Sequence, residues 1–242
     1  MTSSPSDPID PRPGQGASPE PKPIGDPREK IVDALFALLV EKSWANIGLY
    51  DVAARAGVSL AELRALFPSK GAILAGFVRK IDLDVLANDT RDMADEPARE
   101  RIFDVLMRRF EALAPYRDAL RTVRDGLRTD PLGAAAMNQL AVSSMQWMLA
   151  AAGVQEAGPL GTARAQALVL ITARVFATFL NDPDEGLART MKALDEELRK
   201  AERWARRAED VGRLTAPFRG VLDRAMGRPR DTTAPEDVAP AA

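Results

Sequence analysis

The stretch from Leu49 to Leu74 constrains the fold more than any other part of this chain. Residues 51–56 favour a short helix, and Gly57 then provides the left-handed backbone conformation that commonly ends one. Ser59 follows as an N-cap, and Glu62 lies three residues further on, which completes a capping box for a second helix. Two short helices joined by a tight glycine turn are typical of a helix-turn-helix.

The sequence around this motif predicts further helices and no strand. Asp26 and Pro27 form an N-cap and a first-turn proline at the start of an amphipathic helix. Helical spacing of apolar residues continues from Lys70 to about Asn88 after the motif. Further helices are expected over about 97–114, 115–127, 131–153, 161–180 and 183–208. We therefore predict an all-α protein with an N-terminal helix-turn-helix domain of three helices and a larger helical domain behind it.

The composition removes several classes of function. The chain has no cysteine and no histidine, so disulfides, thiolate chemistry, the commonest general base and the commonest metal ligand are all excluded. No acid, base and nucleophile form a recognisable constellation, and we expect neither an enzyme nor a bound metal or cofactor. The formal net charge of −2 means that any affinity for nucleic acid must be local.

Residues 28–80 resemble the N-terminal domain of TetR-family transcriptional regulators. The resemblance rests on the opening amphipathic helix, the segment SWANIGLYDVAARAGVS, the F-P-S-K of residues 67–70 and the apolar helix that follows. It implies a TetR-like fold in which this domain binds operator DNA, while a longer helical domain dimerises and binds a small molecule. The expectation is a cytoplasmic, ligand-responsive, homodimeric regulator that binds double-stranded DNA.

The second motif helix departs from the usual pattern of that family. Leu60 stands where a polar or basic residue is usual, and Arg64 and Ala65 replace an aromatic residue and a Tyr or His. Residues 27–80 carry eight Lys and Arg against five Asp and Glu, a local net charge of +3. The residues expected to face DNA are Tyr50, Arg55, Ser59, Leu60, Ala61, Arg64, Ala65 and Lys70, and phosphate contacts are expected from Arg64 and Lys70. The alternative is that the bundle is a scaffold that no longer reads DNA.

The second domain contains two predicted sites. Phe110, Met137, Met145, Trp147 and Met148 are most simply core residues, but methionines also suit an apolar ligand cavity. The apolar helix of residues 161–180 is followed by a heptad-like stripe of Leu187, Met191, Leu194, Leu198, Ala201, Ala205 and Ala208. Two such helices from each subunit would form a four-helix dimer interface. Packing within one subunit is the alternative.

The end of the chain suggests a second resemblance. Residues 213–230 combine apolar positions on one helical face with five arginines, a pattern that also suits an anionic membrane surface. The stretch VFATFLNDPDEGLARTMKALDEELRKAERW is similar to TetR-fold proteins that bind lipid-like intermediates of ubiquinone biosynthesis and lack DNA recognition. A lipid-binding accessory protein is therefore the alternative function, with membrane binding through this helix.

These observations together predict five segments. Residues 1–26 hold seven prolines and few apolar residues, and they are expected to form a disordered tail, as are residues 231–242. The tail lacks the apolar core of a signal peptide. Between the tails we expect a helix-turn-helix DNA-binding domain over 27–80, a ligand-binding and dimerisation domain over 81–210, and the basic amphipathic helix over 211–230.

Overall fold

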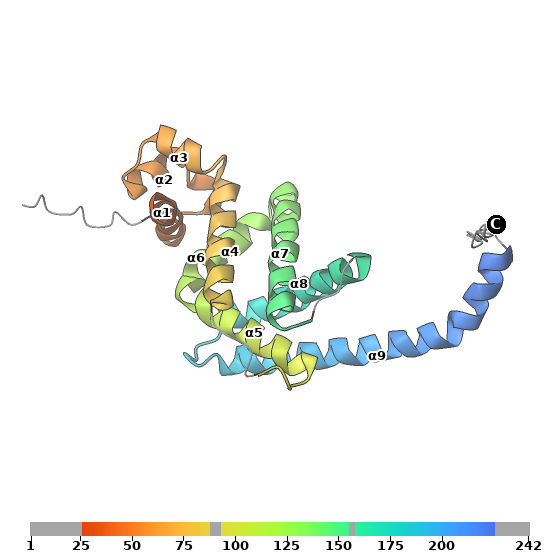
Figure 1. Cartoon of the computed structure of the whole chain (residues 1–242). Helices are drawn as coiled ribbons and strands as arrows, with labels where there is room; N and C mark the ends of the chain where they lie inside the picture. The colour runs from red at the N-terminus through yellow and green to blue at the C-terminus, as the bar shows by residue number, and fades with distance from the viewer. Residues whose placement is uncertain (1–25, 88–92, 155–157, 226–242) are drawn as a thin grey trace, which may run out of the picture.

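The computed structural model describes residues 26–87, 93–154 and 158–225, with side chains up to residue 207, and all of the regular structure in these ranges is helical (Figure 1). The all-α prediction is therefore confirmed. The elements are α1 Pro27–Glu41, η1 Trp44–Asn46, α2 Leu49–Ala56, α3 Leu60–Leu66, α4 Lys70–Leu86, α5 Ala98–Leu113, η3 Ala114–Tyr116, α6 Arg117–Leu127, α7 Pro131–Ala151, α8 Gly158–Leu180 and α9 Ala188–Ala225. Of the predicted tails, residues 1–25 and 231–242 lie outside the described residues, and Asp26 is described as the cap of α1.

Helices α1, α2 and α3 form a small bundle at one end of the molecule. The Asp26 side chain caps α1 by accepting a 3.0 Å hydrogen bond from the backbone N–H of Arg28. Ile31, Leu35 and Leu39 then place the apolar face of α1 in the core, where they are completely buried. Val52 of α2 and Leu63 of α3 belong to the same buried cluster, so a shared core holds both motif helices.

Helix α4 connects this bundle to the rest of the protein. It leaves the motif and runs down into the remaining helices, α5 to α9, which we call the body. There it packs against α5 and α7 (Figure 1). An aromatic cluster secures the junction: the ring centroids of Phe36 and Phe77 lie 3.8 Å apart, and Tyr116 of η3 meets Phe77 edge-on at 4.8 Å. The boundary predicted at residue 80 falls inside α4, so the two predicted parts share a helix and one continuous core.

A buried polar cluster also ties α4 to the body. Arg109 of α5 donates a hydrogen bond to Oδ1 of Asp82 on α4, and the two form a buried ion pair. The Ser144 hydroxyl of α7 donates to the same carboxylate oxygen over 2.7 Å. Because a buried charge is costly unless it is paired, this cluster fixes α4, α5 and α7 at one point.

Helix α9 corrects two expectations drawn from the sequence. It is one continuous helix from Ala188 to Ala225, whereas separate helices were expected before and after residue 210. Leu194 and Leu198, expected in a dimer interface, are buried within the protomer, where α9 packs against α5 and α8. The heptad-like stripe was therefore interpreted wrongly at these positions, because intramolecular helix packing uses the same spacing as packing between subunits.

Candidate nucleic-acid interface

The N-terminus of α3 is held by a complete capping box. The backbone N–H of Glu62 donates to the Ser59 hydroxyl at 3.1 Å, and Oε2 of Glu62 accepts from the Ser59 N–H at 2.7 Å and from its hydroxyl at 2.8 Å. Gly57, with φ of 68°, supplies the left-handed turn before it. The short helix therefore has a defined start and a defined direction, as the sequence indicated.

The carboxylate of Glu62 should make this cap sensitive to acid. Hydrogen bonds from the backbone and then the hydroxyl of Ser59 lower the pKa of Glu62 below its ordinary value of 4.5. Because the pKa of Glu62 is lower in the folded protein than in the unfolded chain, its carboxylate stabilises the fold fully above pH 4.5. This stabilisation is lost as the pH falls through the pKa of the folded state. We expect Glu62→Gln to flatten the fall of the urea midpoint between about pH 5 and pH 3. Glu196→Gln, on the exposed side of α9, is the matched control; parallel acid curves for Glu62→Gln and the parent would contradict the expectation.

Helix α2 begins after Gly48, which has no side chain to cap it, and Asp51 in the first turn of the helix bonds to the Gly48 backbone instead. The Asp51 carboxylate accepts a 2.8 Å hydrogen bond from the Gly48 N–H, and it pairs at 3.3 Å with Lys42, the residue that follows α1. At the other end of α2, Arg55 donates to both carboxylate oxygens of Glu41, at 2.9 and 2.7 Å. These ion pairs between α1 and α2 fix the motif, and they occupy Arg55, which was expected to face DNA.

The outer face of α3 is exposed and mostly apolar. Leu63 is buried and anchors the helix, which leaves Leu60, Ala61, Arg64 and Ala65 in contact with solvent. Leu60 is 49% exposed, and Tyr50 at the start of α2 is 73% exposed. Of the predicted DNA-facing residues, these five therefore remain free to meet a partner, with Arg64 as the cation among them.

The structure gives Lys70 a different role from the one expected. Its ammonium donates to the backbone carbonyl oxygens of Trp44 and Ile47, at 2.5 and 2.8 Å, and lies 4.4 Å from the centroid of the Trp44 ring. Burial lowers the pKa of Lys70. Two of its three N–H donors thus hold η1 against the start of α4, and Lys70 positions the motif from inside it.

Trp44 and Gly126 are positions whose importance the sequence did not reveal. A Cβ on Gly126 of α6 would lie 2.7 Å from the Cβ of Trp44, closer than side chains can approach, so η1 lies directly on the α6 backbone. The helix-turn-helix bundle is thereby seated on the body at a second place besides the aromatic cluster. A glycine near the end of a charged, amphipathic helix was the one available signal, because glycine inside a helix often has a packing reason.

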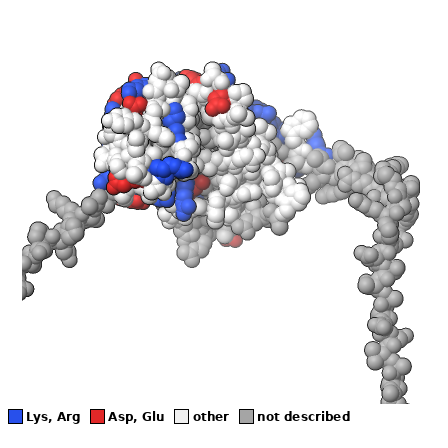
Figure 2. Space-filling model, turned by 90° about the horizontal axis from the view of Figure 1, so that it is seen from above, with Lys and Arg blue, Asp and Glu red and all other residues white. Residues whose placement is uncertain are grey.

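The charge on this end of the molecule is mixed. Figure 2, which looks down on the molecule from above, shows Lys and Arg side chains interspersed with Asp and Glu, and not a single broad basic field. A shallow cleft between α1 and α2 brings Lys42 and Arg55 beside Tyr50. Contact with a polyanion here would therefore depend on a few cations.

The residues of the predicted ligand pocket differ in their exposure. Phe110, Met145 and Met148 are buried core residues and Met137 is half-buried, whereas Trp147 on α7 is 58% exposed. Trp147 therefore lies on the solvent side of α7, apart from the three packed side chains, and the assignment of these residues to a ligand pocket stays a prediction. A cleft does occur between α1 and the η3–α6 segment, lined in part by Phe36, Val40, Lys80 and Tyr116.

Comparison with solved structures identifies the fold that the helix-turn-helix bundle, the connecting α4 and the remaining helices form. No protein-family model and no curated protein matches the chain. A TetR transcriptional regulator from Nitrosomonas europaea ATCC 19718 is similar, with a TM-score of 0.59 and 27% identity over 72% of this chain and 97% of that chain.

Two further regulators support the same fold. One from Rhodococcus sp. RHA1 has a TM-score of 0.50 and 22% identity, over 73% of this chain and 97% of that chain. A third, from Streptomyces coelicolor, has a TM-score of 0.52 and 16% identity, over 85% and 98%. The chain thus has the fold of TetR-family transcriptional regulators, as the first resemblance implied.

Proposed function

We propose that this protein is a DNA-binding transcriptional regulator that acts as a homodimer. The observation that carries the proposal is the exposed outer face of α3, which a capping box and the buried Leu63 hold at one end of a TetR-type fold. A helix presented in this way fits the major groove of B-DNA. The similar solved structures are transcriptional regulators and not enzymes, which supports a non-enzymatic role in the cytoplasm.

The proposed DNA surface combines few charges with several apolar contacts. Arg64 would contact a phosphate, and the Tyr50 hydroxyl would donate a hydrogen bond to the DNA backbone at the edge of the groove. Leu60, Ala61 and Ala65 offer methyl groups, which suit the thymine methyl in the major groove. Arg55 and Lys70 would hold the motif in shape, because both side chains are already bonded within the protein.

The test is DNA affinity across a salt series, with DNA from around the protein's own gene as the probe. Arg64→Ala should weaken binding to all sequences and reduce the slope of log K against log salt by about one. Lys192→Ala, an exposed cation on α9, is the matched control and should leave both quantities unchanged. A parent protein with no salt-dependent affinity for any DNA would refute the proposed function and favour the lipid-binding alternative.

Helix α8 supports the homodimer. Its inner face is buried at Ala165, Leu168, Ile171, Val175 and Phe179, and a second seam on its outer face is exposed at Leu160, Ala163, Ala167, Leu170 and Ala177. From Leu160 to Leu170 the outer seam follows the spacing of three and four residues that packs helices between subunits, and its next position is Arg174, which pairs with Glu197 of α9. By length and composition α8 would also suit a membrane span, with 33% of the relevant window buried. We assign the outer seam to a second copy and not to a membrane, because the inner face of α8 is already buried against other helices of the protomer.

The dimer would link a ligand to DNA binding. Two α3 helices must reach half-sites one helical turn apart, so a small change in their separation alters affinity. The cleft between α1 and α6 is a suitable place for an apolar ligand, because Phe36 and Tyr116 belong both to its wall and to the aromatic cluster that seats the motif. A ligand that displaced these rings would move the helix-turn-helix bundle relative to the body.

A further inference from the structure

Helix α3 carries few side chains that can form hydrogen bonds. Its seven residues, LAELRAL, include no Ser, Thr, Asn, Gln or Lys. Oε2 of Glu62 accepts hydrogen bonds from the N–H and the hydroxyl of Ser59, at 2.7 and 2.8 Å, which holds this carboxylate at the start of the helix. The other exposed positions of α3 are Leu60, Ala61, Arg64 and Ala65. The helix therefore presents three apolar side chains and one cation to a partner.

The apolar positions lie where a helix in the major groove meets the bases. Leu60 and Ala61 are the first two residues of α3, and Ala65 follows Ala61 by one helical turn on the same face. The N-terminal residues of such a helix are the ones that contact base edges. Leu60 is 49% exposed because Leu63 takes the position that faces the core. The Leu60 side chain is thus available to a base.

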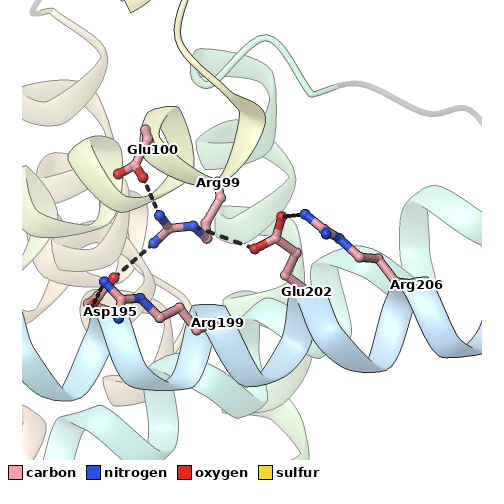
Figure 3. A network of polar contacts seen from close by, with 6 residues as sticks. All are labelled: Arg99, Glu100, Asp195, Arg199, Glu202 and Arg206. Atoms are coloured by element: carbon pink, nitrogen blue, oxygen red, sulfur yellow. Dashed lines mark hydrogen bonds and ion pairs between the residues drawn. The ribbon is translucent and has the colours of Figure 1, made fainter.

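Arg64 differs from arginines at the opposite end of the molecule. In the network between α5 and α9, Arg199 pairs with Asp195 at 3.0 Å (Figure 3). Arg206 pairs with Glu202 at 2.7 Å in the same network. Arg64 has no such partner among the described residues, so its guanidinium is available to a phosphate. The remaining exposed positions of the outer face, Leu60, Ala61 and Ala65, can read bases through apolar contact alone.

The major groove offers such side chains one kind of group. Adenine and guanine are usually read by hydrogen bonds from Asn, Gln, Arg or Lys, whereas apolar side chains contact the C5-methyl group of thymine. 5-Methylcytosine carries a methyl group on the same ring carbon, beside an N4 amino donor where thymine has the O4 acceptor. An apolar side chain forms a hydrogen bond with neither O4 nor N4. It therefore contacts the methyl group and does not read the group beside it.

We propose that α3 recognises the C5-methyl group itself, so that thymine and 5-methylcytosine are bound alike at the positions facing its apolar side chains. Uracil and cytosine, which lack the methyl group, are bound more weakly there. The inference rests on the proposed function, because DNA must lie along α3. It adds a regulatory consequence: methylation of a cytosine at such a position strengthens binding.

The test compares duplexes that differ by one methyl group. A binding sequence is selected from a random duplex pool with the full-length protein, and each thymine is replaced in turn by uracil. Where the loss is largest, cytosine and 5-methylcytosine are placed opposite guanine. We expect a loss of about fourfold from thymine to uracil and a similar gain from cytosine to 5-methylcytosine, since each change transfers one methyl group.

The outcomes separate this inference from the proposed function. Salt-dependent binding of the selected duplex, with thymine and uracil bound equally at every position, would overturn the inference and leave the proposed function standing. A thymine effect without a matching effect of 5-methylcytosine would overturn it as well. A protein with no salt-dependent affinity for any duplex would refute both.

A double-mutant cycle assigns the methyl effect to α3. Leu60→Ala removes three carbons from an exposed side chain and should reduce the thymine-to-uracil loss at the position facing residue 60. Leu83→Ala, the same change at a 55% exposed position of α4, is the matched control and should leave every affinity unchanged. Arg64→Ala should weaken all four duplexes by the same factor. A Leu60→Ala protein that keeps the full methyl effect at every position would place that effect in the shape of the duplex and overturn the inference.

Discussion

Replacing Asp82 with Ala should destabilise the protein by about 3–5 kcal/mol, more than the loss of a single hydrogen bond would cause. The change removes the partner of a guanidinium that is only 9% exposed and leaves Arg109 charged among apolar side chains. It also leaves the Ser144 hydroxyl without its acceptor. Chemical denaturation at neutral pH would measure the loss as a lower midpoint with little change in slope.

Two companion variants separate the sources of that loss. Ser144→Ala removes one hydrogen bond to a charge and should cost about 1.5–3 kcal/mol. Asp82→Leu combined with Arg109→Met removes both charges and should recover most of the stability, because burying a charge pair is itself costly. A double variant as unstable as Asp82→Ala alone would show that the pair contributes through its shape and not through its charge.

Replacing Leu170 with Arg should convert the proposed dimer into a folded monomer. Leu170 is 53% exposed in the protomer, so the new cation meets water in the monomer but an apolar partner in the proposed interface. An unpaired charge there costs several kcal/mol, enough to dissociate a dimer at micromolar concentration. Sedimentation should show the monomer, circular dichroism should show unchanged helicity, and DNA affinity should fall because paired half-sites are no longer bound together.

Leu194→Arg is the matched comparison for that variant. Leu194 is completely buried inside the protomer, so the same side chain placed there should lower the stability of the whole fold and not the oligomeric state alone. Arg164→Leu, an apolar change at an exposed position of α8, should not produce monomer. A Leu170→Arg protein that remains a dimer would contradict the assignment of the outer seam of α8 to a second copy.

The motif itself was predictable from neighbouring residues. Gly57, Ser59 and Glu62 act within a few residues of one another, so their roles are set by local backbone geometry and local hydrogen bonds. The same holds for the Asp26 cap of α1 and for the apolar faces that made the chain all-α. These features need no knowledge of distant contacts, and the structure contains them as expected.

The functional surface was less predictable, because exposure depends on what lies across the fold. Lys70 was expected to meet phosphates, but the carbonyl oxygens of Trp44 and Ile47 come from 26 and 23 residues earlier and take up its ammonium. Arg55 bonds to Glu41 across two helices in the same way. A sequence shows which side chains carry charge, and it does not show which of them are already occupied.

The sequence by itself determined the helices, their caps and the helix-turn-helix, since each depends on interactions within about one or two helical turns. Only the tertiary structure decided which apolar faces are used within the protomer and which are left outside. Leu194 and Leu170 lie in helical stripes of similar spacing, yet the first is buried by α5 and α8 and the second faces solvent. Helical periodicity specifies that a face is apolar, whereas the identity of the surface that covers it depends on how distant helices pack.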